Sequence, residues 1–307
     1  MTGKRIVFIV VLLMVAFGSY MFMNKDYDPL ARYQYKLSTE QHNKVTANLS
    51  SKEIEYLIEY AIAPQEFIDY VGLEGFNIYL LDYYNEMYDL YGWIESKETI
   101  MKLVNVTRDI YTKDELKAVI DDYYIYEILT YYQDGNTEKL ALNVNDVTFM
   151  IPDERSIGYY GPKDLVDVDE RLTVNGNVSV RLELKMMIDD MFLELKTVFP
   201  RTYDVIKIDR GYLSYQQLSS LFQTTNDPIY TVGHSDYQLG LVIDLVIGDD
   251  SFESSDLGQW IINNAYRYGF ILYGDLDEKT MSFRYVGIAL ASSLFEQQVI
   301  DDEVADE

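Results

Sequence analysis

The sequence predicts an α+β protein in three parts: an N-terminal transmembrane helix, a tyrosine-rich all-α region and a C-terminal α+β domain. Three observations predict this class. An uncharged apolar run opens the chain, and helical periodicity with capping signals follows over about residues 49–134. Beyond residue 137, helical and strand patterns mix without a regular βαβ order. The expected boundaries are 1–25 for the anchor, 26–48 for a tether, 49–137 for the helical region, 138–298 for the C-terminal domain and 299–307 for an acidic tail.

The apolar run extends from Ile6 to Met23 without a charge. At ~1.5 Å per residue it nearly crosses a hydrocarbon layer of ~30 Å. Lys4 and Arg5 precede it, which predicts a cytoplasmic N-terminus, a single-pass membrane location and extracytoplasmic C-terminal domains. The alternative is a cleaved signal peptide with a cleavage site ending at Gly18. Tyr20 continues the apolar run beyond that site, which favours the anchor.

Two capping boxes mark helix starts in the second part. Ser50 with Glu53, and Thr112 with Glu115, each precede apolar residues at helical spacing. Seventeen of the 29 tyrosines lie between residues 27 and 132, so this region is expected to be helical and tyrosine-rich. We interpret these tyrosines as packing half-buried faces with their hydroxyls in water. The alternative is a surface that binds carbohydrate or peptide.

The third part alternates between helical and strand patterns. Its expected helices cover residues 177–199, 257–268 and 288–297, and its expected strands cover residues 204–208, 241–247, 270–273 and 283–286.

Composition restricts the function. The net charge of −26 argues against a nucleic-acid partner, because phosphate binding relies on clustered Lys and Arg. The absence of cysteine excludes disulfides, thiolate metal sites and a cysteine nucleophile. Neither H-E-x-x-H nor G-x-S-x-G nor a phosphate-binding loop occurs in the chain.

Five segments resemble a known family over roughly residues 142–297. RGYLSYQQ is similar to S-G-Y-R-S-x-x-x-Q, SDYQLGLVID to S-x-H-x-x-G-x-A-x-D, and WIINNAYRYGFIL to W-L-x-x-N-A-x-x-Y-G-F-I-x. LNVNDVTFMIPDE with GPKDLVDVD, and FRYVG, supply the remaining two. Together they resemble the VanY-like D-alanyl-D-alanine carboxypeptidases, zinc peptidases that share a fold with lysostaphin-type peptidases and the hedgehog domain. The resemblance implies a carboxypeptidase-like domain with a small antiparallel sheet, acting on peptidoglycan.

The functional positions of this family are mostly replaced. The zinc-ligand positions carry Tyr237, Asp244 and Ser282, and only Asp244 is a competent ligand. Lys279 stands at the position of the general base, where its charge is wrong for deprotonating a metal-bound water. Leu213 replaces the arginine that the resemblance expects to hold the substrate carboxylate. No catalytic residue and no metal are therefore expected, and the sequence describes a degenerate member of the family.

Neither histidine is expected to rebuild a metal site. His42 lies in the region expected to be a tether and has no motif around it. His234 lies three residues before Tyr237, and its spacing to Asp244 is ten residues rather than seven. Both are interpreted as bystanders.

Two functional hypotheses follow. The first is a membrane-anchored pseudoenzyme that binds a peptidoglycan stem peptide or a cell-envelope protein without hydrolysis. The alternative is an active zinc D-alanyl-D-alanine carboxypeptidase with a rearranged metal site. In a third possibility, the tyrosine-rich helices do the work and the C-terminal domain is a spacer. The expected ligand groove of the pseudoenzyme is lined by Tyr212, Leu213, Ser235, Tyr237, Asp244, Lys279 and Ser282.

Overall fold

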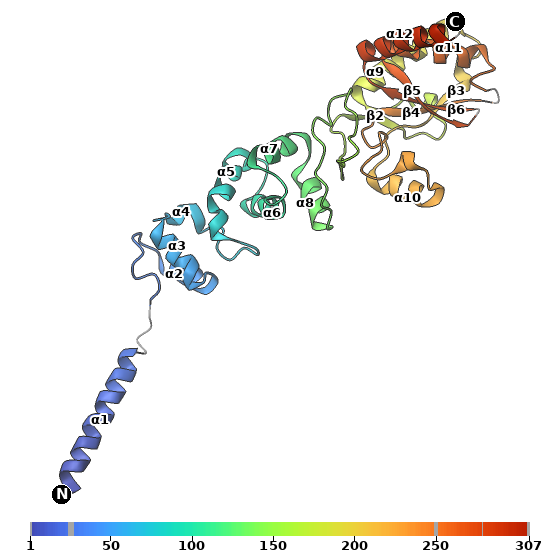
Figure 1. Ribbon diagram of the computed structural model, residues 1–307. Coiled ribbons are helices and arrows are strands. Elements are labelled where there is room, and N and C mark those ends of the chain that lie inside the picture. The colour runs from blue at the N-terminus through green and yellow to red at the C-terminus, as the bar shows by residue number, and fades with distance from the viewer. Residues whose placement is uncertain (1, 24–27, 249–250, 278, 306–307) are drawn as a thin grey trace. The chain divides into compact units, whose positions relative to one another are not determined.

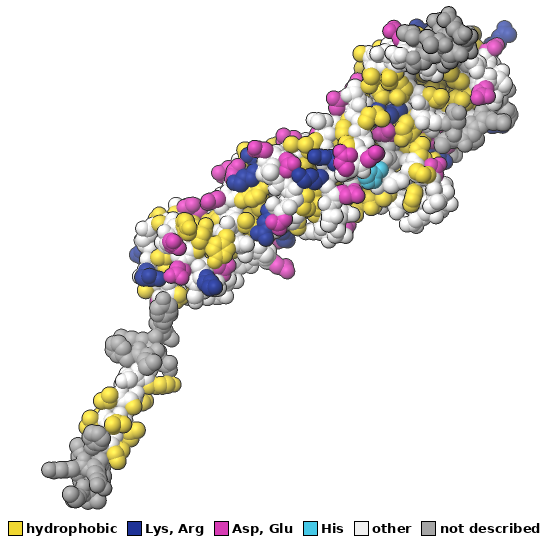
Figure 2. Space-filling view, in the orientation of Figure 1, with side chains coloured by type: hydrophobic (Ala, Val, Ile, Leu, Met, Phe, Trp, Pro, Cys, Tyr) yellow, Lys and Arg dark blue, Asp and Glu magenta, His cyan; other side chains and the backbone are white. Residues whose placement is uncertain are grey.

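The computed structural model of the chain describes residues 2–23, 28–248, 251–277 and 279–305 (Figure 1). It divides into two compact units, Met1–Asn105 and Val106–Glu307. Figure 2 shows acidic side chains interspersed with basic ones over the visible face. This dispersed pattern fits a solvated acidic surface.

Helix α1, Thr2–Met23, forms where the apolar run predicted a helix. The structure describes its side chains only for residues 9–20, a length that rises ~18 Å against the ~30 Å of a hydrocarbon layer. Among the described residues, no helix combines the length and the apolar character needed to cross a bilayer. The predicted transmembrane anchor is therefore not supported. The predicted single-pass membrane location and the predicted membrane partner depend on this anchor, so they are not supported either.

The first unit is helical from residue 49 onward, as predicted, and it also has helix α2 within residues 26–48, which were expected to form a tether. α2 follows the capping Ser38 and α3 follows the capping Ser50, which accepts a hydrogen bond from the Glu53 N–H in the predicted box. The apolar faces of these short helices meet in a core that includes Leu57 and Phe67, both fully buried. Its helices are α2 Thr39–Asn48, α3 Ser51–Glu59, α4 Pro64–Phe67, η1 Ile78–Leu80, α5 Leu81–Tyr91 and α6 Lys97–Thr107.

The tyrosines of this unit serve two environments. Tyr70 and Tyr84 are fully buried, and their rings lie 5.7 Å apart. Tyr60 and Tyr79 are exposed, and each ring lies within 5 Å of the ring of Tyr56. The two buried rings differ from the predicted half-buried packing with hydroxyls in water, since the Tyr84 hydroxyl donates to Oδ1 of Asn105 at 2.6 Å. The alternative of a binding surface stays a prediction.

The second unit begins with α7, Lys113–Asp122, and α8, Ile125–Gln133. The predicted capping box of Thr112 and Glu115 is present at the start of α7. A two-stranded antiparallel sheet then pairs β1, Leu165–Asp167, with β2, Ser179–Arg181. α9 therefore covers Leu182–Val198 rather than 177–199. The pairing with β1 keeps residues 179–181 extended despite their helical periodicity.

The core of this unit is a four-stranded antiparallel sheet in the order β3-β4-β6-β5. Helices α9, α11 and α12 lie over one face, and α10 lies on the opposite side (Figure 1). The α+β class with a small antiparallel sheet is thus confirmed. The strands are β3 Ile206–Arg210, β4 Val242–Ile247, β5 Phe270–Asp277 and β6 Thr280–Tyr285, and the helices are α10 Tyr215–Thr225, α11 Asp256–Asn264 and α12 Ile288–Ala305. Short 3-10 turns occur at Glu170–Leu172, Tyr203–Val205, Pro228–Tyr230 and Ala265–Tyr268.

α12 extends into the stretch expected to be an acidic tail, and residues 306–307 of that tail lie outside the described residues. The predicted domain boundaries stay predictions.

Gly269 joins the 3-10 turn to β5 with a φ of +84°. A Cβ there would lie 2.6 Å from Cε2 of Tyr285 and 2.9 Å from the backbone carbon of Gly287. We expect Gly269→Ala to lower the free energy of unfolding by ~3 kcal/mol, because left-handed strain adds to overlap. Gly135→Ala is the matched control. Gly135 has a φ of +88° and open space around it, so the expected loss is ~1 kcal/mol. If urea denaturation showed equal losses of unfolding free energy for Gly269→Ala and Gly135→Ala, steric overlap at Gly269 would be contradicted.

Candidate functional site

Tyr237, Asp244 and Ser282 converge in the second unit. Asp244 on β4 and Ser282 on β6 are direct partners in the antiparallel register. Tyr237 lies in the turn before β4, which Gly240 closes with a φ of +68° and an N–H donated to the carbonyl of Tyr237. The strand register and this turn bring together three residues that lie up to 45 positions apart in the sequence.

The three side chains form a hydrogen-bonded cluster. The Tyr237 hydroxyl donates to Oδ1 of Asp244 at 2.5 Å, and the Ser282 hydroxyl donates to the same oxygen at 2.7 Å. The two hydroxyl oxygens lie 3.1 Å apart. All three residues are fully buried, with 0% exposure, so the cluster is closed to solvent.

Arg210 supplies the positive charge nearest to this cluster in the part of the chain that the structure describes. Its Nη1 lies 3.7 Å from Oδ2 of Asp244 and donates to the hydroxyl of Tyr230 at 2.7 Å. Burial raises the pKa of Asp244, against the lowering effect of the two hydroxyl donors and the guanidinium. Burial and the charge of Asp244 raise the pKa of Tyr237 well above its usual range, so this phenol stays protonated at neutral pH.

These residues do not fit a zinc ion. A zinc hydrolase supplies three deprotonated or neutral-nitrogen ligands and one open position for water. Here both hydroxyls point their protons at the one carboxylate, and a neighbouring guanidinium compensates its charge. Within the described ranges, His, Asp and Glu side chains form no group of three or more that could hold a metal.

An apolar cluster fills the space beside Tyr237. Its ring lies 5.7 Å from the ring of Tyr230 and 6.3 Å from that of Tyr273. Leu213, at the position where the family has arginine, is buried in this cluster and donates its N–H to the carbonyl of Tyr237 at 3.2 Å. Leu213 thus packs beside Tyr237 as part of this apolar cluster.

Three further residues of the predicted groove lie outside this hydrogen-bonded cluster. Ser235 is buried, and its hydroxyl donates to the carbonyl of Ile229 at 2.6 Å. Lys279 is exposed in the turn between β5 and β6, where its carbonyl accepts the N–H of Ile247. Tyr212 lines a separate hollow beside Glu127.

Both histidines pair with carboxylates outside the cluster. His42 lies 3.0 Å from Asp28, and His234 lies 3.6 Å from Glu138. The role of the groove itself stays a prediction.

Sequence reasoning missed Arg210 and Tyr230. Arg210 is the first residue of the RGYLSYQQ segment and lies at the end of β3, three residues before the position where the family has arginine. A basic residue so close to that position was the available signal. Tyr230 could not have been found, because only the folded chain brings the turn before β4 to the end of β3.

We expect Tyr237→Phe to lower the free energy of unfolding by ~2 kcal/mol at pH 7, because Asp244 loses a charge-assisted donor in a buried site. The loss of this donor also raises the already raised pKa of Asp244 further. The ionised carboxylate then costs more, so the deficit of the variant should grow as pH rises through the raised folded-state pKa of Asp244 and shrink at lower pH. Urea denaturation from pH 4 to 8 measures this. The control is Tyr60→Phe at an exposed position, where the change should stay within ~0.5 kcal/mol. A pH-independent deficit would contradict the role of Asp244.

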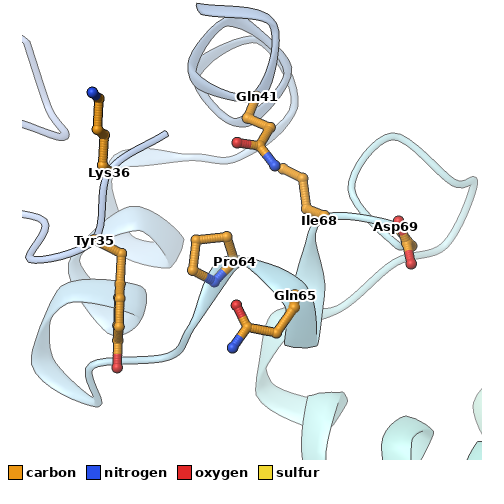
Figure 3. Close-up of a pocket in the computed structure, with 7 residues that line it drawn as sticks. All are labelled: Tyr35, Lys36, Gln41, Pro64, Gln65, Ile68 and Asp69. Atoms are coloured by element: carbon orange, nitrogen blue, oxygen red, sulfur yellow. The ribbon is translucent and has the colours of Figure 1, made fainter. Parts of the chain in front are cut away.

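A different hollow, of about 470 Å³, lies in the first unit (Figure 3). Pro64 lies at its centre, and Lys36 and Asp69 lie on opposite sides of it. Lys36 and Asp69 are both exposed, and Asp69 already pairs with Lys97 at 2.7 Å. None of the polar residues that line this hollow is buried. It therefore offers fewer fixed polar groups for binding a ligand than the cluster around Asp244.

Comparisons with curated proteins find two carboxypeptidases that are similar to part of the chain. It is 28% identical over 134 residues to "Putative carboxypeptidase YodJ" of Bacillus subtilis (strain 168), a match that covers 38% of this chain and 47% of that protein. It is 28% identical over 108 residues to a D-alanyl-D-alanine carboxypeptidase of Enterococcus faecium, covering 32% of this chain and 36% of that protein. The chain therefore spans less than half the length of the curated relatives it matches. No family model matches the chain.

Solved structures of similar fold include three peptidases. The LD-carboxypeptidase LdcB is 22% identical, covers 51% of this chain and 84% of its own, and gives a TM-score of 0.42. The D,D-dipeptidase VanXYg, solved with a D-Ala-D-Ala phosphinate analogue, is 18% identical over 50% of this chain and 67% of its own, with a TM-score of 0.41. The D,D-pentapeptidase VanY, solved as a mutant in complex with Zn(II), is 18% identical over 50% of this chain and 94% of its own, with a TM-score of 0.36.

The part of the chain that matches these relatives has a carboxypeptidase-like fold. The resemblance to the VanY-like D-alanyl-D-alanine carboxypeptidases that the sequence predicted is confirmed.

Proposed function

We propose that this protein is a non-hydrolytic member of the D-alanyl-D-alanine carboxypeptidase fold that binds peptidoglycan stem peptides ending in D-Ala-D-Ala. One observation carries the loss of hydrolysis. The Tyr237 hydroxyl lies within hydrogen-bonding distance of both Asp244 and Ser282, at the three positions where the family has its zinc ligands. A hydroxyl bonded to both ligand positions occupies the point at which a metal would activate water.

The charges around the cluster support this proposal. Arg210 compensates Asp244 from within the chain, which is the electrostatic task of the metal in a hydrolase. At the position of the general base, Lys279 is a cation, and an ammonium has no lone pair with which to take a proton from water. Both replacements oppose hydrolysis and leave a fold suited to holding a peptide.

Binding is proposed from the relatives that act on such peptides and from two cations. The carboxypeptidase of Enterococcus faecium is named for D-alanyl-D-alanine. Arg210, with a side chain 36% exposed, and Lys279, exposed in its turn, are the candidates to meet the terminal carboxylate of a peptide. The probe is N-acetyl-D-Ala-D-Ala, and its C-terminal amide is the matched control. Arg210→Gln or Lys279→Gln should weaken the binding of the acid more than that of the amide.

The decisive experiment combines turnover with metal content. The full chain is incubated with a D-Ala-D-Ala-terminated pentapeptide, with added zinc and with EDTA, and released D-Ala and bound zinc are measured. We expect no release above background in either condition and less than stoichiometric zinc. Stoichiometric zinc with EDTA-sensitive release would establish the alternative, an active zinc carboxypeptidase. No binding of the acid probe at millimolar concentration would overturn the peptide-binding role.

A further inference from the structure

The second unit has a hollow of about 400 Å³. It lies between α8, the segment 159–161 and the chain that follows β3. Four tyrosines and two carboxylates dominate its lining, and no lysine or arginine is among its lining residues. The six are Tyr126, Glu127, Asp134, Tyr159, Tyr212 and Tyr215.

Glu127 lies at the buried end of this hollow, with only 4% of its surface exposed. Oε2 accepts the N–H of Tyr124 at 3.0 Å, and Oε1 accepts the N–H of Gly161 at 3.1 Å. The hydroxyl of Tyr126 lies 3.4 Å from Oε1. All three donors are uncharged, so these hydrogen bonds leave a buried carboxylate without a cation bonded to it. Such a group is costly unless a positive charge reaches it.

The outer part of the hollow adds a second carboxylate and aromatic rings. The Tyr159 hydroxyl donates to Oδ2 of the exposed Asp134 at 2.6 Å. The Tyr159 ring lies 4.4 Å from the ring of Tyr215. Aromatic faces attract organic cations, and carboxylates at both depths attract them further. An uncharged sugar would use the rings but not the charges.

We propose that this hollow binds a primary ammonium group on a flexible chain, such as the lysine side chain of a peptide. Its ammonium would pair with Glu127, its methylene groups would lie against the tyrosine rings, and Asp134 would attract it at the rim. This inference does not depend on the proposed peptide-binding function, because Arg210 and Lys279 are not among the residues that line this hollow.

The probe is N-acetyl-lysine methylamide, with N-acetyl-norleucine methylamide as its uncharged counterpart. NMR titration of the full chain should show the lysine probe binding at least about tenfold more tightly than the norleucine probe, the equivalent of ~1.4 kcal/mol. Glu127→Gln should remove this preference while the unfolding transition shows a folded protein. Equal affinity for the two probes, or an unchanged preference in the folded variant, would overturn the proposal. If Glu127→Gln does not fold, Asp134→Asn serves as the second test variant. We expect its preference for the lysine probe over the norleucine probe to be smaller than that of the unchanged protein.

The affinity should also depend on pH. Burial raises the pKa of Glu127 to about 7, and binding of an ammonium requires the ionised carboxylate. We therefore expect affinity about tenfold weaker at pH 6 than at pH 8, with no such change in Glu127→Gln. The charged groups nearest to Glu127 are Asp134 at the rim of the hollow and Lys163. The tyrosines facing Glu127 have pKa values raised above 10 and stay neutral: Tyr123, Tyr126, Tyr160 and Tyr212.

The two binding proposals can fail separately. Glu127→Gln should leave the affinity for N-acetyl-D-Ala-D-Ala unchanged, because that probe carries no ammonium. A loss of both affinities in a folded variant would show that the hollow is part of the stem-peptide site, and the separate ammonium site would then be rejected.

Discussion

Replacing Tyr237 and Ser282 together by histidine is expected to give a protein that binds one equivalent of zinc. Asp244 and Ser282 are paired across two strands, and the Tyr237 hydroxyl reaches both. Imidazoles at the two replaced positions, with Asp244, make a three-ligand site with room for water, which is the arrangement of a catalytic zinc. Metal analysis after dialysis and calorimetric titration measure the result.

Two controls separate the ligands from the substitution itself. Tyr237→Phe with Ser282→Ala changes the same positions without adding ligands and should hold no zinc. Adding Asp244→Asn to the double histidine variant should weaken zinc binding, whereas adding Arg210→Gln should strengthen it by removing a cation 3.7 Å from the carboxylate. A folded double histidine variant that binds no zinc would show that these positions do not converge as described.

Arg284→Met is expected to lower the free energy of unfolding by ~3–5 kcal/mol. The Arg284 side chain is fully buried, its Nε lies 3.0 Å from Oδ2 of Asp236, and its Nη2 donates to the carbonyl of Phe149. Methionine fills much of the same space but leaves Asp236 as a buried charge without its partner, which is the costly way to break an ion pair.

The control for this prediction is Arg267→Met. Arg267 pairs with Glu194 at 3.0 Å, but the two side chains are 45% and 35% exposed, so the expected loss is at most ~1 kcal/mol. Burial already raises the pKa of Asp236, and loss of Arg284 raises it further. The deficit of Arg284→Met should therefore be larger at pH 8 than at pH 4 in urea denaturation. Equal deficits in the two variants would contradict the importance of burial.

Local signals in the sequence predicted much of the fold. The capping boxes at Ser50 and Thr112 depend on residues three positions apart, and both occur in the structure. The family segments assigned Asp244 and Ser282 to ligand positions of one site, and the antiparallel register of β4 and β6 pairs these two residues. Element boundaries were predicted wrongly where contacts between distant segments set the structure. The start of α9 shifted because β2 pairs with β1.

The site could be predicted less completely than the fold. Replacements at family positions are visible in a sequence, so Tyr237, Ser282 and Leu213 were identified. Arg210 and Glu127 were missed because neither their burial nor their charge partners can be read from neighbouring residues. Tyr212 was assigned to the groove by analogy alone, and its side chain lines the hollow beside Glu127. The expected membrane anchor rested on hydropathy, which the described helices do not support.

The bond from Tyr237 to Asp244 also bears on how the domain is assembled. It links the turn before β4 to strand β4 through two side chains of the protein itself. In the proposed non-hydrolytic protein, a centre built in this way matures without a metal ion. Cells starved of zinc should then give the same yield of folded protein as cells with ample zinc.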